Sequence, residues 1–104
     1  MKITKEDKEW AIKVKERDNN RCVICKNTDR TNAHHIIPRE IEGLRHNIIN
    51  GISLCPKHHR FSRKLSAHQN PLAFLIWLEE NKREQLSYLR EQVFFNNEEL
   101  NKYL

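Results

Sequence analysis

The chain has 104 residues, a net charge of +5 and a pI near 9.3, and its length predicts one small domain. Its apolar stretches are too short to cross a membrane and its Lys- and Glu-rich start does not resemble a signal peptide, so we expect a cytoplasmic protein. The three cysteines, an odd number, favour thiolate metal ligands in a reducing compartment over a disulfide framework. The basic net charge fits either a nucleic-acid partner or simple solubility.

The first predicted element is a helix over residues 4–18. Thr4 can cap it, and Asp7, three residues later, completes an imperfect capping box. Trp10 and Val14 fall on one apolar face at helical spacing, and charged residues occupy the rest. We therefore interpret Trp10 as a core anchor rather than a base-stacking residue. Residues 18–20, an Asp and two Asn, end the helix.

Two short strands are predicted next, over residues 31–37 and 48–54. Pro38 ends the first, because proline has no N–H to donate to a strand ladder. A polar loop containing Gly43 connects the two strands. Inside the second, Asn50 followed by Gly51 indicates a turn or a bulge.

Helices are predicted for the remainder of the chain. Pro56 opens a helix that runs to about Ala67, and Asn70 followed by Pro71 starts another. We expect an apolar helix over 72–80, an amphipathic one over 82–95 and a short one over 98–104. The sequence shows no linker, so we predict an α+β chain forming one domain over 1–104, with its core at about 20–68 and a C-terminal helical extension at about 70–104.

Cysteine and histidine spacing predicts a structural metal site. Cys22 and Cys25 are separated by two residues, and so are Cys55 and His58. Two such turns can surround a tetrahedral zinc without long loops, and thiolate and imidazole ligands suit zinc. The alternative is three free cysteines and a surface histidine. His59 also competes for the fourth position, but neighbouring helical residues point about 100° apart, so only one of the pair can face the zinc.

The segment from Asn32 to Lys64, together with the Cys22 turn, resembles the HNH nuclease motif on a ββα-metal fold. The matching pieces are residues 33–38 (Ala-His-His-Ile-Ile-Pro), residues 50–55 (Asn-Gly-Ile-Ser-Leu-Cys) and residues 56–60 (Pro-Lys-His-His-Arg). The named H, N and H fall on His35, Asn50 and His59. The resemblance implies a two-stranded hairpin plus a helix, stabilised by zinc and flanked by helices that the motif does not cover.

The resemblance also implies a division of roles among these residues. His35 is the expected general base, Asn50 orients it by holding the loop between the strands, and His34 and His59 ligate a catalytic divalent ion (Mg, Mn, Ni or Zn). Many relatives carry Asp where this chain has His34, so its ligand set is neutral and favours softer ions over Mg. Neighbours in a strand point to opposite faces, and His34 and His35 can share a site only near a strand end or a twist.

Several basic residues accompany this motif. Arg39, Arg60, Arg63 and Lys64 are candidate phosphate contacts, Arg45 is a further one, and a solvated helix face is the alternative for those after residue 59. His46 and His68 are expected at the surface, although His68 can approach a phosphate. The apolar stretch over 72–78 is expected to be core or a dimer contact.

The sequence therefore predicts a metal-dependent DNA endonuclease with one structural zinc and one catalytic ion. A zinc-stabilised nucleic-acid-binding module without cleavage is the second hypothesis, and a redox protein using Cys22 and Cys25 is the third. The sequence leaves open whether so small a nuclease comes from a phage, a mobile element or a restriction system. Its oligomeric state is left open.

Overall fold

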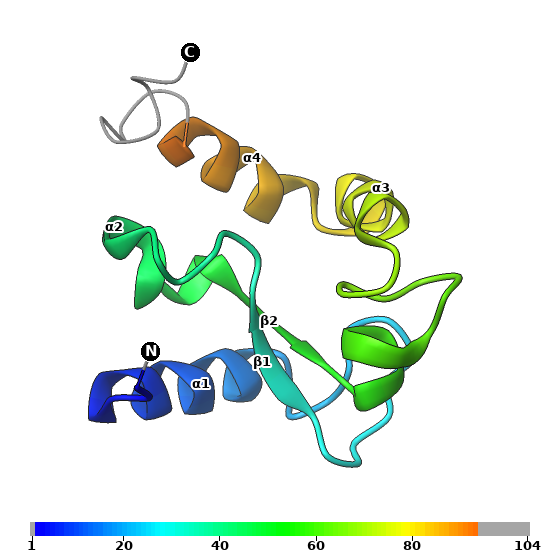
Figure 1. Ribbon diagram of the computed structural model, residues 1–104, viewed down its shortest axis with the longest axis horizontal. Coiled ribbons are helices and arrows are strands. Elements are labelled where there is room, and N and C mark those ends of the chain that lie inside the picture. The colour runs from blue at the N-terminus through cyan, green and yellow to red at the C-terminus, as the bar shows by residue number, and fades with distance from the viewer. Residues whose placement is uncertain (1, 94–104) are drawn as a thin grey trace.

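A two-stranded antiparallel hairpin lies at the centre of the fold, as the computed structural model shows (Figure 1). The structure describes residues 2–93. Strand β1 (Asn32–His35) pairs with β2 (Gly51–Leu54), and the register places His34 opposite Ile52 and His35 opposite Gly51. Both strands are shorter than predicted. Because strand side chains alternate, His34 and His35 face opposite sides of the hairpin.

Helix α1 (Lys5–Arg17) covers the face of the hairpin to which His35 and Gly51 point. The predicted capping box is present: Thr4 accepts a hydrogen bond from the Asp7 amide, and Asp7 accepts one from the Thr4 amide. Trp10 and Val14 are buried on the inner side of the helix. The predicted helix and its core anchor are therefore confirmed.

The segment between the strands is folded rather than being a plain loop. It contains a short helix, α2 (Glu42–Arg45), and a 3-10 turn, η1 (Ile48–Asn50), where the sequence predicted the start of the second strand. The Asn47 side chain accepts a hydrogen bond from the Ile49 amide and so caps this turn. That local bond is available before any strand pairing forms, which explains why the strand begins three residues late.

The helix predicted from Pro56 to Ala67 ends early. It is a single wide turn, η2 (Lys57–Phe61), closed by a hydrogen bond from the Ser62 amide to the Lys57 carbonyl. Beyond Phe61 the chain bends back on the turn, because the amides of Ala67 and His68 donate to the carbonyls of His58 and His59. The predicted helical placement of Arg63 and Lys64 was therefore wrong, and both lie in this returning loop.

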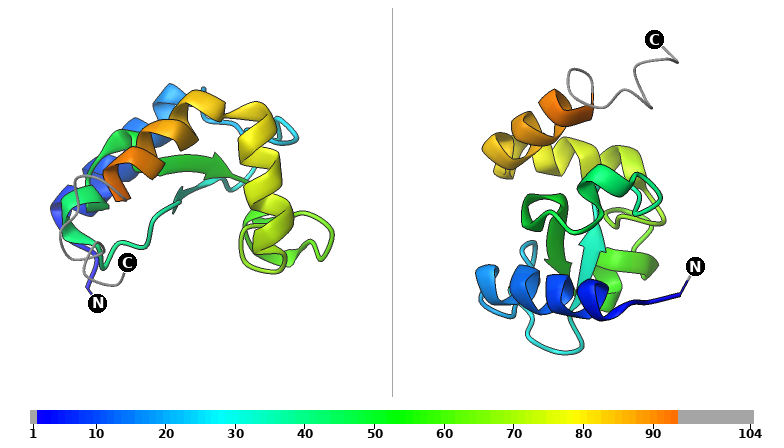
Figure 2. Two further views of the ribbon diagram at one scale, coloured as in Figure 1. Left: turned by 90° about the horizontal axis from the view of Figure 1, so that it is seen from above. Right: turned by 90° about the vertical axis from the view of Figure 1, so that its left-hand side faces the viewer.

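Two helices lie across the opposite side of the hairpin from α1 (Figure 2). Helix α3 (Pro71–Asn81) starts at an Asn70 cap as predicted, and α4 (Arg83–Glu91) follows after a break at Lys82. The core gathers apolar residues from the turn after α1, the hairpin, α3 and α4: Val23, Ile52, Leu54, Phe74, Leu78 and Leu86. The helix predicted over 98–104 lies outside the described residues.

Helices α1 and α4 both hold the turn that leads into β2. Arg17 donates to the carbonyls of Ile48 and Gly51, and Gln85 donates to those of Ile49 and Gly51. In the described part of the chain, no helix is long and apolar enough to cross a membrane. The observed fold is the small α+β arrangement predicted, with the hairpin and the η2 turn forming its ββα unit.

Candidate metal centres and active site

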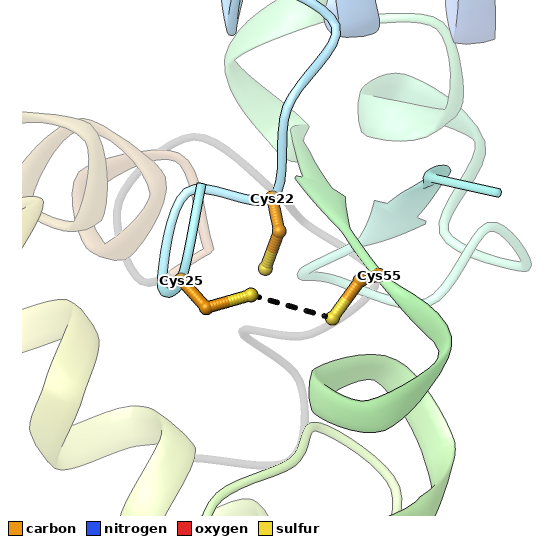
Figure 3. A group of neighbouring side chains, drawn as sticks. All are labelled: Cys22, Cys25 and Cys55. Atoms are coloured by element: carbon orange, nitrogen blue, oxygen red, sulfur yellow. Dashed lines mark hydrogen bonds between the residues drawn. The ribbon is translucent and has the colours of Figure 1, made fainter. Parts of the chain in front are cut away.

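Three thiols from two distant segments meet at the end of β2. Cys22 and Cys25 come from the turn after α1, Cys55 directly follows β2, and their sulfur atoms all lie within 4.8 Å of one another (Figure 3). The Cys25 and Cys55 sulfurs are 3.7 Å apart. A zinc–thiolate tetrahedron with bonds of about 2.3 Å has sulfurs roughly 3.8 Å apart. The three side chains therefore fit one ion of this size.

His58 is buried, but the cysteine group among the described residues does not include it. Its Nδ1 donates a hydrogen bond of 2.9 Å to the Leu65 carbonyl, which fixes the ring against the returning loop. This leaves Nε2 as the nitrogen with a lone pair for an ion. His58 as the fourth zinc ligand stays a prediction.

The thiols differ in how easily they ionise. Burial opposes ionisation of Cys22, but backbone N–H groups of Cys55, Cys25 and Ile24 outweigh it and lower the pKa of this thiol. Burial raises the pKa of Cys55 to about 11, and the neighbouring thiols add to the rise. A bound cation offsets this cost, because a metal ligand must be a thiolate.

A second group consists of three histidine rings on the α3 side of the hairpin. Ligand nitrogens of His34, His59 and His68 all lie within 4.8 Å of one another. The Nε2 atoms of His59 and His68 are 3.2 Å apart, near the roughly 3.3 Å separation expected of two imidazoles on one tetrahedral zinc. His34 meets both other rings edge to face and also contacts Phe74. The rings thus surround a common point, as ligands of one ion do.

The His34 and His59 rings are kept neutral, which is the form that binds a metal. Burial lowers the pKa of His34 to about 3, with the neighbouring His59 and His68 rings adding to the effect. Burial also lowers the pKa of His59 to about 4, helped by the charges of His68 and Arg60. The Nδ1 of His59 is buried and has no hydrogen-bond partner among the described residues. With Nε2 of this ring facing His68, Nδ1 carries the proton of the neutral imidazole, and a buried donor of this kind is costly to leave unpaired.

His68 was missed as a member of this group by sequence reasoning, which placed it at the surface. The side chain is indeed exposed, yet its ring reaches His59 because the loop after η2 folds back. Its spacing from His59 matches no helix or strand period. The sequence signal was only the presence of a third histidine shortly after the motif.

His35 is the last residue of β1, and its ring lies on the α1 side. It stacks on Trp10, and its Nε2 donates a 2.9 Å hydrogen bond to the Arg45 carbonyl. Burial lowers the pKa of His35, although this carbonyl and the Asp7 charge oppose the shift. The ring is therefore neutral at pH 7, with Nδ1 as its unprotonated nitrogen. A charge on His35 also lowers the pKa of His34, after larger effects of burial and of His59 and His68, so the two sites are electrostatic neighbours.

Asn50 ties together the segment that connects the strands. It is fully buried, its Oδ1 accepts from the Ile37 amide at 2.7 Å, and its Nδ2 donates to the carbonyls of Ile37 and Leu44. These bonds fix the end of β1 and the end of α2, the two places that supply His35 and its Arg45 partner. The geometry agrees with the loop-holding position expected from the sequence.

The candidate phosphate contacts have separate surroundings. Arg60, Arg63 and Lys64 are exposed on η2 and the returning loop, and Arg39 is half-buried near His35. Arg45 does not fit its predicted role as a phosphate clamp. It makes two hydrogen bonds to the buried Asp7 carboxylate, at 2.9 and 2.6 Å, so the structure uses its guanidinium internally.

Comparison with known proteins gives one family. Residues 22–61 match the family described as HNH endonuclease. Searches among curated proteins and among solved structures gave no match. The matched segment runs from the first cysteine to the end of η2, so it contains the hairpin, the cysteine group, His34, His35, Asn50 and His59. Over residues 22–61, the chain is therefore similar to the HNH endonuclease family.

Proposed function

We propose that the chain is a metal-dependent DNA endonuclease that hydrolyses phosphodiester bonds with one catalytic ion and a histidine base. The observation that carries this proposal is the convergence of His34, His59 and His68 beside His35. Stability of the fold alone does not require such a group, because imidazoles with facing nitrogens repel one another when protonated, and the buried Nδ1 of His59 has no partner among the described residues when the ring is neutral.

His34, His59 and His68 are the proposed ligands of the catalytic ion. When bound, the ion supplies Lewis-acid stabilisation of the negative charge that develops on the phosphate and on the leaving oxygen. Three neutral imidazoles are softer than the oxygen ligands that Mg prefers, so this set favours Mn, Ni or Zn. The exposed His68 closes the solvent side, and His34 is braced from behind by Phe74.

His35 is the proposed general base. The Arg45 carbonyl can only accept a hydrogen bond, so the proton of the neutral ring resides on Nε2 and the lone pair on Nδ1. Nδ1 takes a proton from the attacking water, which an imidazole that is unprotonated at neutral pH can do. Asn50 orients the base by fixing the chain on both sides of it.

The remaining residues hold the fold and the substrate. Cys22, Cys25 and Cys55, with His58 as the proposed fourth ligand, hold a structural zinc beside the hairpin. Arg39, Arg60, Arg63 and Lys64 contact DNA phosphates on either side of the cleaved bond, which fixes the register without reading sequence. The single domain over 1–104 is proposed on the same footing, with α3 and α4 as its C-terminal extension.

A plasmid-nicking assay with Mg, Mn, Ni or Zn tests this proposal. His35→Ala should reduce the rate by about 10²–10⁴, without rescue by added metal, because it removes proton transfer and no ligand. His34→Ala, His59→Ala and His68→Ala should instead raise the metal concentration needed for half-maximal cutting. Lys8→Ala, an exposed basic change on α1, serves as a control for lost positive charge.

The outcomes separate the rival functions. A wild-type protein that binds DNA but does not nick it with any of the four ions is a binding module without cleavage. If His35→Ala responds to added metal and His34→Ala does not, the two roles are exchanged. Nicking unaffected by all four histidine variants places the active centre elsewhere.

A further inference from the structure

Helix α1 lies outside the segment that matches the family, yet it supplies the ring that stacks on His35. The Trp10 and His35 rings are stacked with their centres 3.8 Å apart and their planes within 10°. Trp10 is itself fixed: it is only 4% exposed, and its Nε1 donates a 2.8 Å hydrogen bond to the Asn47 carbonyl. The indole therefore presents a rigid flat surface that determines the plane of the His35 ring.

A second contact fixes the edge of the same ring. The carbonyl that accepts from His35 Nε2 belongs to Arg45, whose guanidinium makes two hydrogen bonds to Asp7 on α1. This ion pair is shielded, with 15% of the Arg45 side chain and 7% of Asp7 exposed. Asp7 also accepts from the Thr4 amide and from His46. The Arg45 backbone is thus anchored to α1 through one buried carboxylate.

Together these contacts leave the ring little freedom. Stacking alone allows an imidazole to rotate in its plane, and one hydrogen bond alone allows it to tilt about that bond. With both contacts present, the direction of Nδ1 is determined. Packing that only buried the ring would not need the stacking and the hydrogen bond together. Errors of about 1 Å in placing a reacting group can cost about 10²-fold in rate.

We propose that Trp10 and the Asp7–Arg45 pair are positioning residues that aim Nδ1 of His35 at the attacking water, so that α1 forms part of the catalytic centre. The proposal rests on the proposed function, since it needs His35 to be the base. The effect is on proton transfer and not on binding, because none of these side chains belongs to the histidine group or to the proposed phosphate contacts.

Steady-state nicking kinetics test this on four variants. Trp10→Leu removes the aromatic surface and should lower kcat by about 10- to 10²-fold while leaving KM and the metal requirement unchanged. Trp10→Phe keeps an aromatic face and should recover most of the lost kcat. Asp7→Asn keeps the shape of the carboxylate and should lower kcat in the same way as Trp10→Leu. Val14→Ala is the matched control, since Val14 is buried on the same helix and packs against Gly51 beside Trp10.

Val14→Ala should lower the melting temperature but leave the kcat of the folded protein unchanged. This result distinguishes positioning of His35 from a general loosening of α1. If Trp10→Leu loses no more kcat than Val14→Ala, the proposal is wrong. The same conclusion follows if Trp10→Phe, which keeps the fold, is as slow as Trp10→Leu.

A double-mutant cycle with His35→Ala provides the sharpest readout. A residue that acts through His35 should cost nothing more once His35 is gone, so Trp10→Leu should leave the rate of the His35→Ala protein unchanged. A further 10-fold loss in that background contradicts the positioning role. If instead His35→Ala alone nicks at the wild-type rate, the base assignment fails, and that outcome is distinct from a failure of Trp10 alone.

Discussion

At the scale of single residues, adjacent histidines on one strand occupy two different environments. His34 joins His59 and His68, whereas His35 stacks on Trp10 and binds a backbone carbonyl. The sequence predicted both residues as functional and also predicted their opposite directions from strand alternation. It did not predict His68 or the partners of His35, because those contacts depend on the folding back of a loop and on the packing of a helix 25 residues earlier in the chain.

The cysteine group gives a residue-scale prediction for stability. Cys25→Ser should remove one ligand of the proposed structural zinc, and such an ion can contribute on the order of 10 kcal/mol of apparent binding energy to a small domain. We expect loss of about one zinc per chain and loss of the cooperative thermal transition, because the net stability of such a domain is of similar size. The measurement is zinc content by mass spectrometry together with a melting curve.

Arg21→Ser, an exposed change in the same segment, is the matched control and should keep zinc and melting temperature. A Cys25→Ser protein that retains its zinc and melts like wild type would rule out the three-cysteine site.

At the scale of elements, the ends of helices and strands were predicted correctly where a local hydrogen bond marks them. Helix α1 and the Asn70 start of α3 were predicted well because their caps are local signals. The predicted second strand and the helix after Pro56 were too long, since the Asn47 cap and the η2 turn compete with them over a few residues. The bonds from Arg17 and Gln85 to the carbonyls of Ile48 and Ile49 hold the Asn47-capped turn further, and a sequence pattern does not contain these tertiary contacts.

The contact between α1 and β2 gives an element-scale prediction. A Cβ added at Gly51 would lie 2.5 Å from a Val14 methyl and 2.6 Å from the Trp10 ring. Gly51→Ala should therefore push α1 away from the hairpin and lower the free energy of unfolding by about 1–3 kcal/mol, as overpacked cores do. Urea unfolding provides the measurement.

Gly43→Ala is the matched control, because a Cβ there meets nothing within 4 Å. Gly43 lies in α2, so its replacement by Ala should be neutral or stabilise the helix by up to about 1 kcal/mol. Adding Val14→Ala to Gly51→Ala should recover part of the lost stability. Equal stability of the Gly51→Ala and wild-type proteins would contradict the close approach of α1.

At the scale of the whole molecule, the cysteine group and the histidine group accompany one small apolar core. The core residues come from the turn after α1, the hairpin, α3 and α4; Cys22 and Cys55 are part of this core, whereas the three imidazoles are not. A chain of this size buries a limited apolar area, and metal ligation is one way to supplement it. The spacing of cysteines and histidines in the sequence predicted that metal ligation supplements the core. Which residues form the thiol group and which form the imidazole group became clear only from the fold.

The same arrangement makes stability depend on pH in a defined direction. His34 and His59 have folded-state pKa values of about 3 and about 4, both lowered chiefly by burial, against about 6.5 in an unfolded chain. Between pH 6.5 and pH 4 the unfolded chain therefore binds more protons, so the free energy of unfolding falls as the pH falls. A bound ion acts in the same direction, since it also requires neutral rings.

Asp7 adds a second fall in the free energy of unfolding at lower pH. Its hydrogen bonds from Arg45 hold the pKa of this carboxyl far below its ordinary value, so the stabilisation that it gives is present above about pH 4 and is lost as the pH falls further.

Urea unfolding at a series of pH values should show wild type losing stability from pH 6.5 downward. His34→Gln should show a shallower decline between pH 6.5 and 4, and Asp7→Asn a shallower decline only below pH 4. Because protonation of the cysteine group is common to all three proteins, the differences between them isolate the histidine and the carboxylate. Parallel curves for wild type and His34→Gln would mean that His34 is not held neutral by burial.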